Sequence, residues 1–93
     1  MLRITQKPGA GRNTLLLEGN LLKEWIEELQ QALARARQDG EAPGLDLSGL
    51  RFVDAEGARF LRECRRRGVS LLAASPFVSA LIDPPPRPRR PRS

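Results

Sequence analysis

Apolar and polar residues alternate with two different periods along the first 82 residues of this 93-residue chain. Alternation over residues 2–6 and the apolar run at 14–18 predict two strands, and the turn-rich segment between them predicts a hairpin connection. The second run places apolar side chains on both faces, which predicts a central strand. Gly9 and Gly11 match half of a phosphate-binding loop, but a third glycine and a following helix are missing, so a plain hairpin loop is favoured.

The longest helical repeat lies between residues 21 and 39. Asn20 is predicted to cap its start and Gly40 to end it. Trp25 is open to two interpretations, a ring that stacks on a ligand or a core side chain, and its place within the apolar stripe favours the core. The stripe recurs at helical spacing and consists of Leu22, Trp25, Ile26, Leu29, Leu33 and Ala36.

Residues 45–57 read LDLSGLRFVDAEG and join a strand to a helix. The apolar start predicts a short buried strand that the Ser-Gly pair breaks. Leu50 and Phe52 then alternate with their neighbours, so both are predicted to point inward. Asp54 is predicted to cap the following helix, because its carboxylate can accept the free N–H groups of the first turn. This helix start would collect partial positive charge and favour an anion.

The second helix is predicted from about residue 55 to 67, closed by Gly68. A fourth strand is predicted over 69–74, followed by a short helix that Ser75 and Pro76 begin. A helical wheel separates an apolar face, Gly57, Phe60, Leu61 and Cys64, from a charged face, Arg59, Arg62, Glu63 and Arg66. The apolar side of the short helix is predicted to be Phe77, Val78, Leu81 and Ile82.

This order of elements predicts one α/β domain over residues 1–83. Its four-stranded mixed sheet combines a hairpin with two right-handed β-α-β units and is covered by helices. Residues 84–93 contain only proline, arginine and serine, which predicts a disordered, polyproline-like tail. The tail is open to a passive role or to binding an acidic protein or nucleic acid, and the passive role is favoured.

The net charge of +5 is mostly a property of the C-terminal end. Four of the 16 basic residues fall in residues 83–93 beside one acid, which leaves 12 basic and 10 acidic residues in the nearly balanced remainder. The sequence therefore does not predict nucleic acid as a partner, except weakly through the basic tail. One cysteine and no apolar signal or membrane-spanning segment favour a cytoplasmic protein without membrane insertion.

The stretch Asp46-Leu47-Ser48-Gly49-Leu50-Arg51-Phe52, followed by Asp54-Ala55-Glu56-Gly57, resembles the signature of STAS domains, the family of the anti-sigma-factor antagonists. That signature is a strand reading D-L-S-x-V-x-F and then D-S-S-G opening a helix. The resemblance extends over roughly residues 2–82 and implies the same STAS-like fold. In the switchable members a partner kinase phosphorylates the second serine, and Glu56 occupies that position here, so no phosphorylation is expected.

The resemblance implies a non-catalytic protein-protein interaction module whose partner is a kinase-like anti-sigma factor. Its contact surface would include Asp54, Ala55, Glu56, Gly57, Arg59 and Arg62. Three interpretations of Glu56 stay open: a mimic of the phosphorylated state, a residue that a different partner surface accepts, or a plain solvated helix-start residue. The second is favoured over the first. The alternative function is a STAS-type structural subunit of a transport ATPase complex, with an ATPase subunit as partner.

Catalysis finds little support in the residue types. Asp46, Asp54 and Glu56 are the carboxylates worth testing as an acid-base pair, but each has a structural explanation. Without histidine there is no Ser-His or Cys-His pair, and Cys64 falls on an apolar helix face, as a core residue does. No catalytic residue, metal site or cofactor is predicted.

Overall fold

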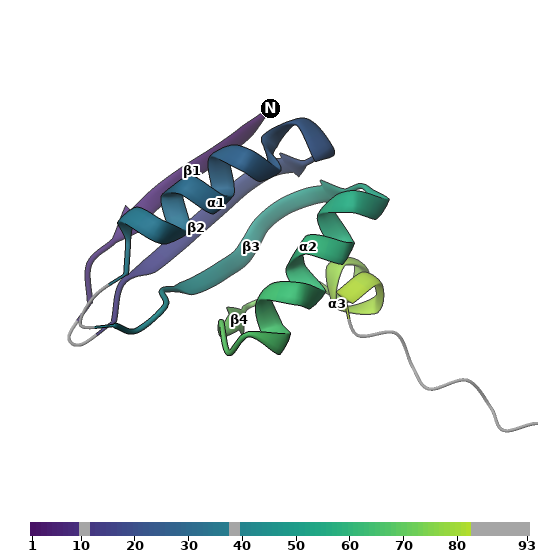
Figure 1. The fold of residues 1–93 in the computed structure, drawn as a ribbon. Helices are drawn as coiled ribbons and strands as arrows, with labels where there is room; N and C mark the ends of the chain where they lie inside the picture. The colour runs from purple at the N-terminus through teal and green to yellow at the C-terminus, as the bar shows by residue number, and fades with distance from the viewer. Residues whose placement is uncertain (10–11, 38–39, 83–93) are drawn as a thin grey trace, which may run out of the picture.

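The structure is a computed structural model that describes residues 1–9, 12–37 and 40–82 (Figure 1). The tail that the sequence predicts to be disordered, residues 84–93, and the predicted domain end at residue 83 lie outside the described residues. In chain order the elements are β1 (Leu2–Lys7), β2 (Thr14–Leu21), a 3-10 helix η1 (Lys23–Trp25), α1 (Ile26–Arg35), β3 (Gly44–Val53), α2 (Ala55–Arg66), β4 (Leu71–Leu72) and α3 (Pro76–Ile82).

The four strands form one mixed sheet in the order β1-β2-β3-β4. β1 and β2 pair antiparallel as a hairpin, whereas β2 with β3 and β3 with β4 pair parallel. The predicted α/β fold, with a hairpin and two β-α-β units, is confirmed, and so is the central position of the second strand. The resulting sheet advances in one direction from β1 to β4.

α1 and α2 pack on the same face of this sheet (Figure 1). Two right-handed crossovers that advance in the same direction place both helices on one side. Burial along β2 follows this layering, since Leu15, Leu17 and Leu21 are buried while Leu16 and Glu18 between them are only half-buried. The core therefore lies between the two helices and one sheet face, and Arg3, Thr5 and Glu18 line the other face.

β3 is one continuous strand, so the predicted break at Ser48 and Gly49 is wrong. Two register shifts against β2 each place one additional residue in β3: Leu47 and Ser48 face one residue of β2, and Arg51 has no counterpart. The buried positions therefore follow as Leu45, Leu47, Leu50 and Val53 instead of every second residue. The inward position predicted for Leu50 is confirmed and that for Phe52 is wrong, because the second shift directs Phe52 to solvent.

The first long helix is shorter than predicted at both ends. Asn20 lies inside β2, where its backbone N–H donates to the carbonyl of Met1 at 2.9 Å, so the predicted N-cap is wrong. The helix ends at Arg35 instead of near Gly40, which lies beyond the last turn in the left-handed region. The Nδ2 of Asn13 donates to the carbonyl of Ala36 at 2.9 Å, which provides a tertiary partner at this helix end.

The C-terminal elements follow the prediction in order but not in length. α2 and its closure at Gly68, which has a φ of 93°, are confirmed. β4 has two residues instead of six, because Ala73 adopts a φ of 56° and turns the chain out of the sheet. Ser75 begins α3 as predicted, since its Oγ accepts the N–H of Val78 at 3.2 Å, whereas Phe77 is exposed instead of joining the apolar side.

Candidate functional site

The β3–α2 junction is organised by the carboxylate of Asp54. Its Oδ1 accepts the N–H of Gly57 at 2.7 Å, which confirms the predicted helix cap. Its Oδ2 accepts the N–H of Lys23 at 2.8 Å, and Lys23 is the first residue of η1. One side chain therefore holds the N-termini of two helical segments that lie 31 residues apart, and the backbone N–H of Asp54 donates to Leu21 at the end of β2.

Gly57 lets α2 approach this end of the sheet closely. The residue is buried, and a Cβ at this position would lie 2.6 Å from the carbonyl oxygen of Leu21 and 3.0 Å from a methyl carbon of Val53. Gly57 thus belongs to the packing beneath the helix start instead of the surface above it. Gly57 is one of the six residues predicted to bind a partner, and this packing role is sufficient to explain why a glycine stands there.

Four side chains face solvent around the junction: Phe52, Ala55, Glu56 and Arg59, which we term the junction surface. Ala55 and Arg59 are exposed, Glu56 is half-buried, and a carboxylate oxygen of Glu56 lies 3.8 Å from a guanidinium nitrogen of Arg59. Phe52 leaves 47% of its surface accessible, which is unusual for a phenylalanine within a strand. The alternation of residues along the strand did not predict that Phe52 is exposed, because this exposure follows from the register shift between β3 and β2.

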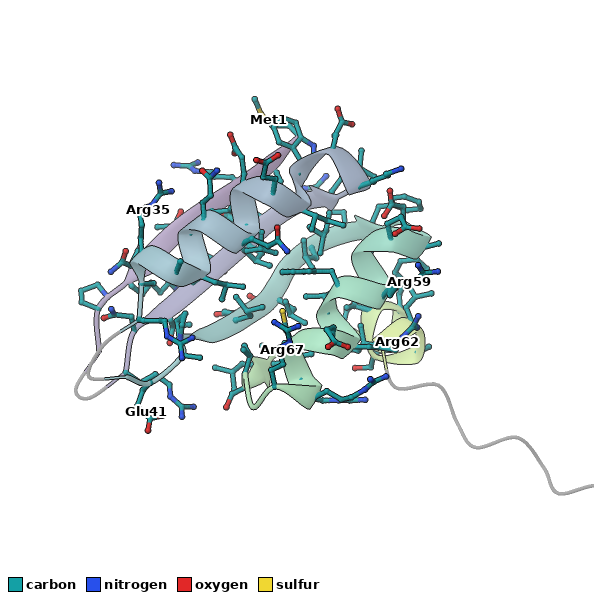
Figure 2. All side chains as sticks on the ribbon, in the orientation of Figure 1. Met1, Arg35, Glu41, Arg59, Arg62 and Arg67 are labelled. Atoms are coloured by element: carbon teal, nitrogen blue, oxygen red, sulfur yellow. The ribbon has the colours of Figure 1, made fainter. Side chains whose placement is uncertain are left out.

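Arg62 is connected to α3. Its Nη1 donates to the carbonyl of Leu81 at 2.8 Å, and Arg65 donates similarly to Ile82 at 3.1 Å. Figure 2 shows Arg59 and Arg62 on the outer side of α2, with Arg62 beside α3. The last carbonyls of a helix lack internal partners, so these two arginines cap α3 and complement its dipole. Arg62 therefore has a structural function, whereas Arg59 belongs to the junction surface.

A shallow hollow of about 530 Å³ adjoins the junction surface on the side of η1. Leu22, Lys23, Glu24, Glu27 and Asp54 line it. Both glutamates are exposed, and together with Glu56 they give this end of the domain an acidic border. The junction thus combines an apolar ring, Phe52, with charged side chains of both signs, since Lys23 and Arg59 are exposed beside these glutamates.

The three carboxylates considered for acid-base chemistry have separate partners. Asp46 accepts the backbone N–H of Ser48 at 2.9 Å, and one of its oxygens lies 3.9 Å from Nζ of Lys7. The hydrogen bonds from Ser48 lower the pKa of Asp46, and the bond from the Ser48 backbone has the largest effect. The charge of Lys7 also lowers this pKa, with the smallest effect. Asp54 caps two helical segments and Glu56 pairs with Arg59. Each carboxylate thus has a structural partner.

Cys64 and Trp25 both lie in or against the core. Cys64 is buried within α2, and desolvation raises the pKa of its thiol to about 11. Trp25 is half-buried and packs against the core cluster, in agreement with the favoured interpretation, and its buried Nε1 has no hydrogen-bond partner in the described part of the chain. Within residues 1–9, 12–37 and 40–82, no group of three or more His, Cys, Asp or Glu residues is placed to hold a metal ion.

A comparison with known family models and with curated proteins found no match to this chain. None of the helices described here has the length and apolar character needed to cross a membrane.

Proposed function

We propose that the chain is a non-catalytic protein-protein interaction module that acts in the manner of an anti-sigma-factor antagonist, without a serine phosphorylation switch. Its contact surface is the junction surface. The observation that carries the proposal is the exposed ring of Phe52 beside the start of α2. Asp54 holds this helix start in place, because its carboxylate accepts two backbone hydrogen bonds. The resemblance to STAS domains supplies the class of partner, a kinase-like anti-sigma factor.

Phe52 supplies the apolar anchor of the proposed interface. A phenylalanine side chain presents about 200 Å² of surface, so the 47% that is accessible corresponds to roughly 90 Å² that a partner can cover. At about 25 cal/mol per Å² this burial contributes about 2 kcal/mol, the size of an interface hot spot. Because Asp54 orders the neighbouring backbone before binding, little conformational entropy remains to be lost.

Glu56 supplies a permanent charge in place of a switch. Its carboxylate is planar, carries one negative charge and interacts with Arg59 within the same helix. A phosphoserine would carry nearly two charges on a tetrahedral group. A partner that accepts Glu56 therefore meets a smaller, partly neutralised charge, which favours constitutive binding over regulation at this position.

The experiment measures the affinity of a purified kinase-like anti-sigma factor, encoded near this chain or captured by it, for parent and variant chains. Phe52→Ser should weaken binding about 30-fold, the equivalent of about 2 kcal/mol. Leu72→Ser is the matched control, since Leu72 is 44% exposed but lies on β4 beside the start of β3, away from the junction surface. Leu72→Ser should leave the affinity within about twofold, as surface changes outside the contact do.

Two substitutions of Glu56 test two separate points: whether its side chain contacts the partner, and whether a serine at this position would be phosphorylated. With a partner that presents a basic group to Glu56, Glu56→Arg should weaken binding more than it lowers the stability, because like charges in an interface cost several kcal/mol whereas one charge at an exposed helix start costs about 1 kcal/mol. Glu56→Ser restores a hydroxyl at the family's phosphoacceptor position and should become a substrate for the partner kinase, while the parent chain does not. Unchanged affinity in folded Phe52→Ser and Glu56→Arg chains would exclude the junction surface.

A further inference from the structure

The two edges of the sheet differ in how they are protected. β4 forms a two-residue edge, and α3 follows it and contacts β3. β1 forms the other edge with six residues, and no described strand pairs with its outer side. An open edge of this length presents unpaired backbone groups that can pair with another strand.

The outward-facing groups of β1 follow from its pairing with β2. The N–H of Asn20 donates to the carbonyl of Met1 at 2.9 Å, and the register continues as Leu2 with Gly19 and Ile4 with Leu17. Hydrogen-bonded and non-bonded pairs alternate in an antiparallel ladder. The residues of β1 that bond to β2 are therefore the odd-numbered ones, and the N–H and C=O groups of Leu2, Ile4 and Gln6 point away from the sheet.

A groove of about 410 Å³ runs along this edge on the helix face. Its residues from the sheet are Leu2, Ile4, Gln6 and Leu15, and those from α1 are Glu28, Gln31, Ala32 and Arg35. Because α1 runs antiparallel to β2, it runs in the direction of β1, so Glu28 lies toward the Leu2 end and Arg35 toward the Gln6 end. Figure 2 shows Arg35 directed outward past β1, toward the open side of the strand.

We propose that the edge of β1 and the adjoining groove form a two-fold symmetric interface with a second copy of this chain, in which the two β1 strands pair antiparallel with Ile4 opposite Ile4. This register also places Leu2 opposite Gln6 of the second copy. Each of these pairs exchanges two backbone hydrogen bonds, so all the outward groups of Leu2, Ile4 and Gln6 become satisfied. The two sheets join into one continuous sheet.

Charge complementarity selects this partner and this register. A two-fold axis at Ile4 brings Glu28 of one copy to Arg35 of the other, twice, across the joined groove. On the opposite face Arg3 comes opposite Thr5. The neighbouring registers would place Arg3 opposite Arg3 or opposite Lys7, and like charges directly opposite each other destabilise a strand pair. This interface lies at the other edge of the sheet from α2 and thus leaves the junction surface free.

Sedimentation of the 93-residue chain over a range of concentrations tests the proposal. The parent should shift from monomer to dimer as concentration rises. Glu28→Arg and Arg35→Glu should each weaken the dimer about tenfold, because two exposed ion pairs per dimer turn from attractive to repulsive. The combined Glu28→Arg and Arg35→Glu chain should recover the parent affinity. Glu27→Arg is the matched control, with the same charge change on α1 but outside the groove, and should dimerise as the parent does.

Disulfide trapping tests the register. Ile4→Cys should cross-link to itself under mild oxidation, since directly opposed residues of a hydrogen-bonded pair have Cα atoms about 5.5 Å apart, within disulfide range. Thr5→Cys, which faces Arg3 of the second copy, should remain largely uncross-linked. The buried Cys64 is protected from this reaction in both chains. A parent chain that sediments only as a monomer, equal cross-linking at both positions, or no recovery in the double charge variant would overturn the proposal.

Discussion

Asp54 is the residue whose replacement the structure makes most informative. Its Oδ1 receives the N–H of Gly57 at 2.7 Å and its Oδ2 receives the N–H of Lys23 at 2.8 Å. Asp54→Ala removes both acceptors, whereas Asp54→Asn keeps one oxygen and replaces the other with an amide that can only donate. The two substitutions therefore separate the local helix cap from the tertiary bond to η1.

The expected magnitudes follow from these contacts. Loss of an N-cap costs about 1 kcal/mol. A hydrogen bond to a charged group contributes about 1.5–3 kcal/mol, and the exposure of the bond to Lys23 places it near or below the lower value. Asp54→Ala should therefore lower the free energy of unfolding by about 2–3 kcal/mol, and Asp54→Asn by about 1 kcal/mol. A domain of this size is stable by roughly 5–10 kcal/mol, so both variants should fold.

Urea unfolding followed by the fluorescence of Trp25 measures these differences. Trp25 is the single tryptophan of the chain and lies in η1, directly beside the bond under test. Lys23→Pro provides the second arm of a double-mutant cycle, because proline lacks the N–H that Asp54 accepts. The preceding Leu22 already has the extended conformation (φ −111°, ψ 159°) that a following proline requires.

In the Lys23→Pro background, Asp54→Asn should lower the stability by only a few tenths of a kcal/mol, which gives a coupling energy of about 1 kcal/mol between the two residues. Asp54→Asn in the parent with no loss of stability would refute the role of the second oxygen. The same loss in both backgrounds would show that the asparagine acts on the helix cap and not on η1.

Three further predictions concern buried or bonded groups. At pH 8 a thiol reagent should modify Cys64 roughly 100-fold more slowly in the native chain than in urea, because burial raises the pKa of the thiol from 9.0 to about 11. Equal modification rates in the two states would contradict the buried position. The free energy of unfolding should also fall as pH rises above 9.0, since the thiol of the unfolded chain ionises first. The lowered pKa of Asp46 means that its contribution is present above about pH 4 and disappears as pH falls through the lower native value; Asp46→Asn should thus reduce stability at neutral pH and flatten its acid dependence in calorimetry, and parallel pH profiles would count against the bond to Ser48. Gly57→Ala should lower the melting temperature although alanine favours helices by about 1 kcal/mol, because its Cβ would lie 2.6 Å from the carbonyl of Leu21; a rise would show that α2 can shift outward.

The sequence alone predicted the order and pairing of the elements and the features of α2. Asp54, Gly68 and the apolar spacing from Gly57 to Cys64 act within a few residues along the chain, so their consequences do not depend on distant partners. The right-handed crossover rule then converts the order of elements into sheet topology. For the candidate site, this local logic was sufficient to place Asp54, Glu56 and Arg59 at one helix start.

Only the tertiary structure decided which of these residues reach the surface and what else they bind. Phe52 is exposed because β3 shifts register against β2, and the second oxygen of Asp54 reaches Lys23 because η1 lies beside the end of β3. Arg62 caps α3 for a similar reason. Each of these contacts joins residues 19 or more positions apart, and their geometry follows from how whole elements pack, which no local pattern of residues encodes.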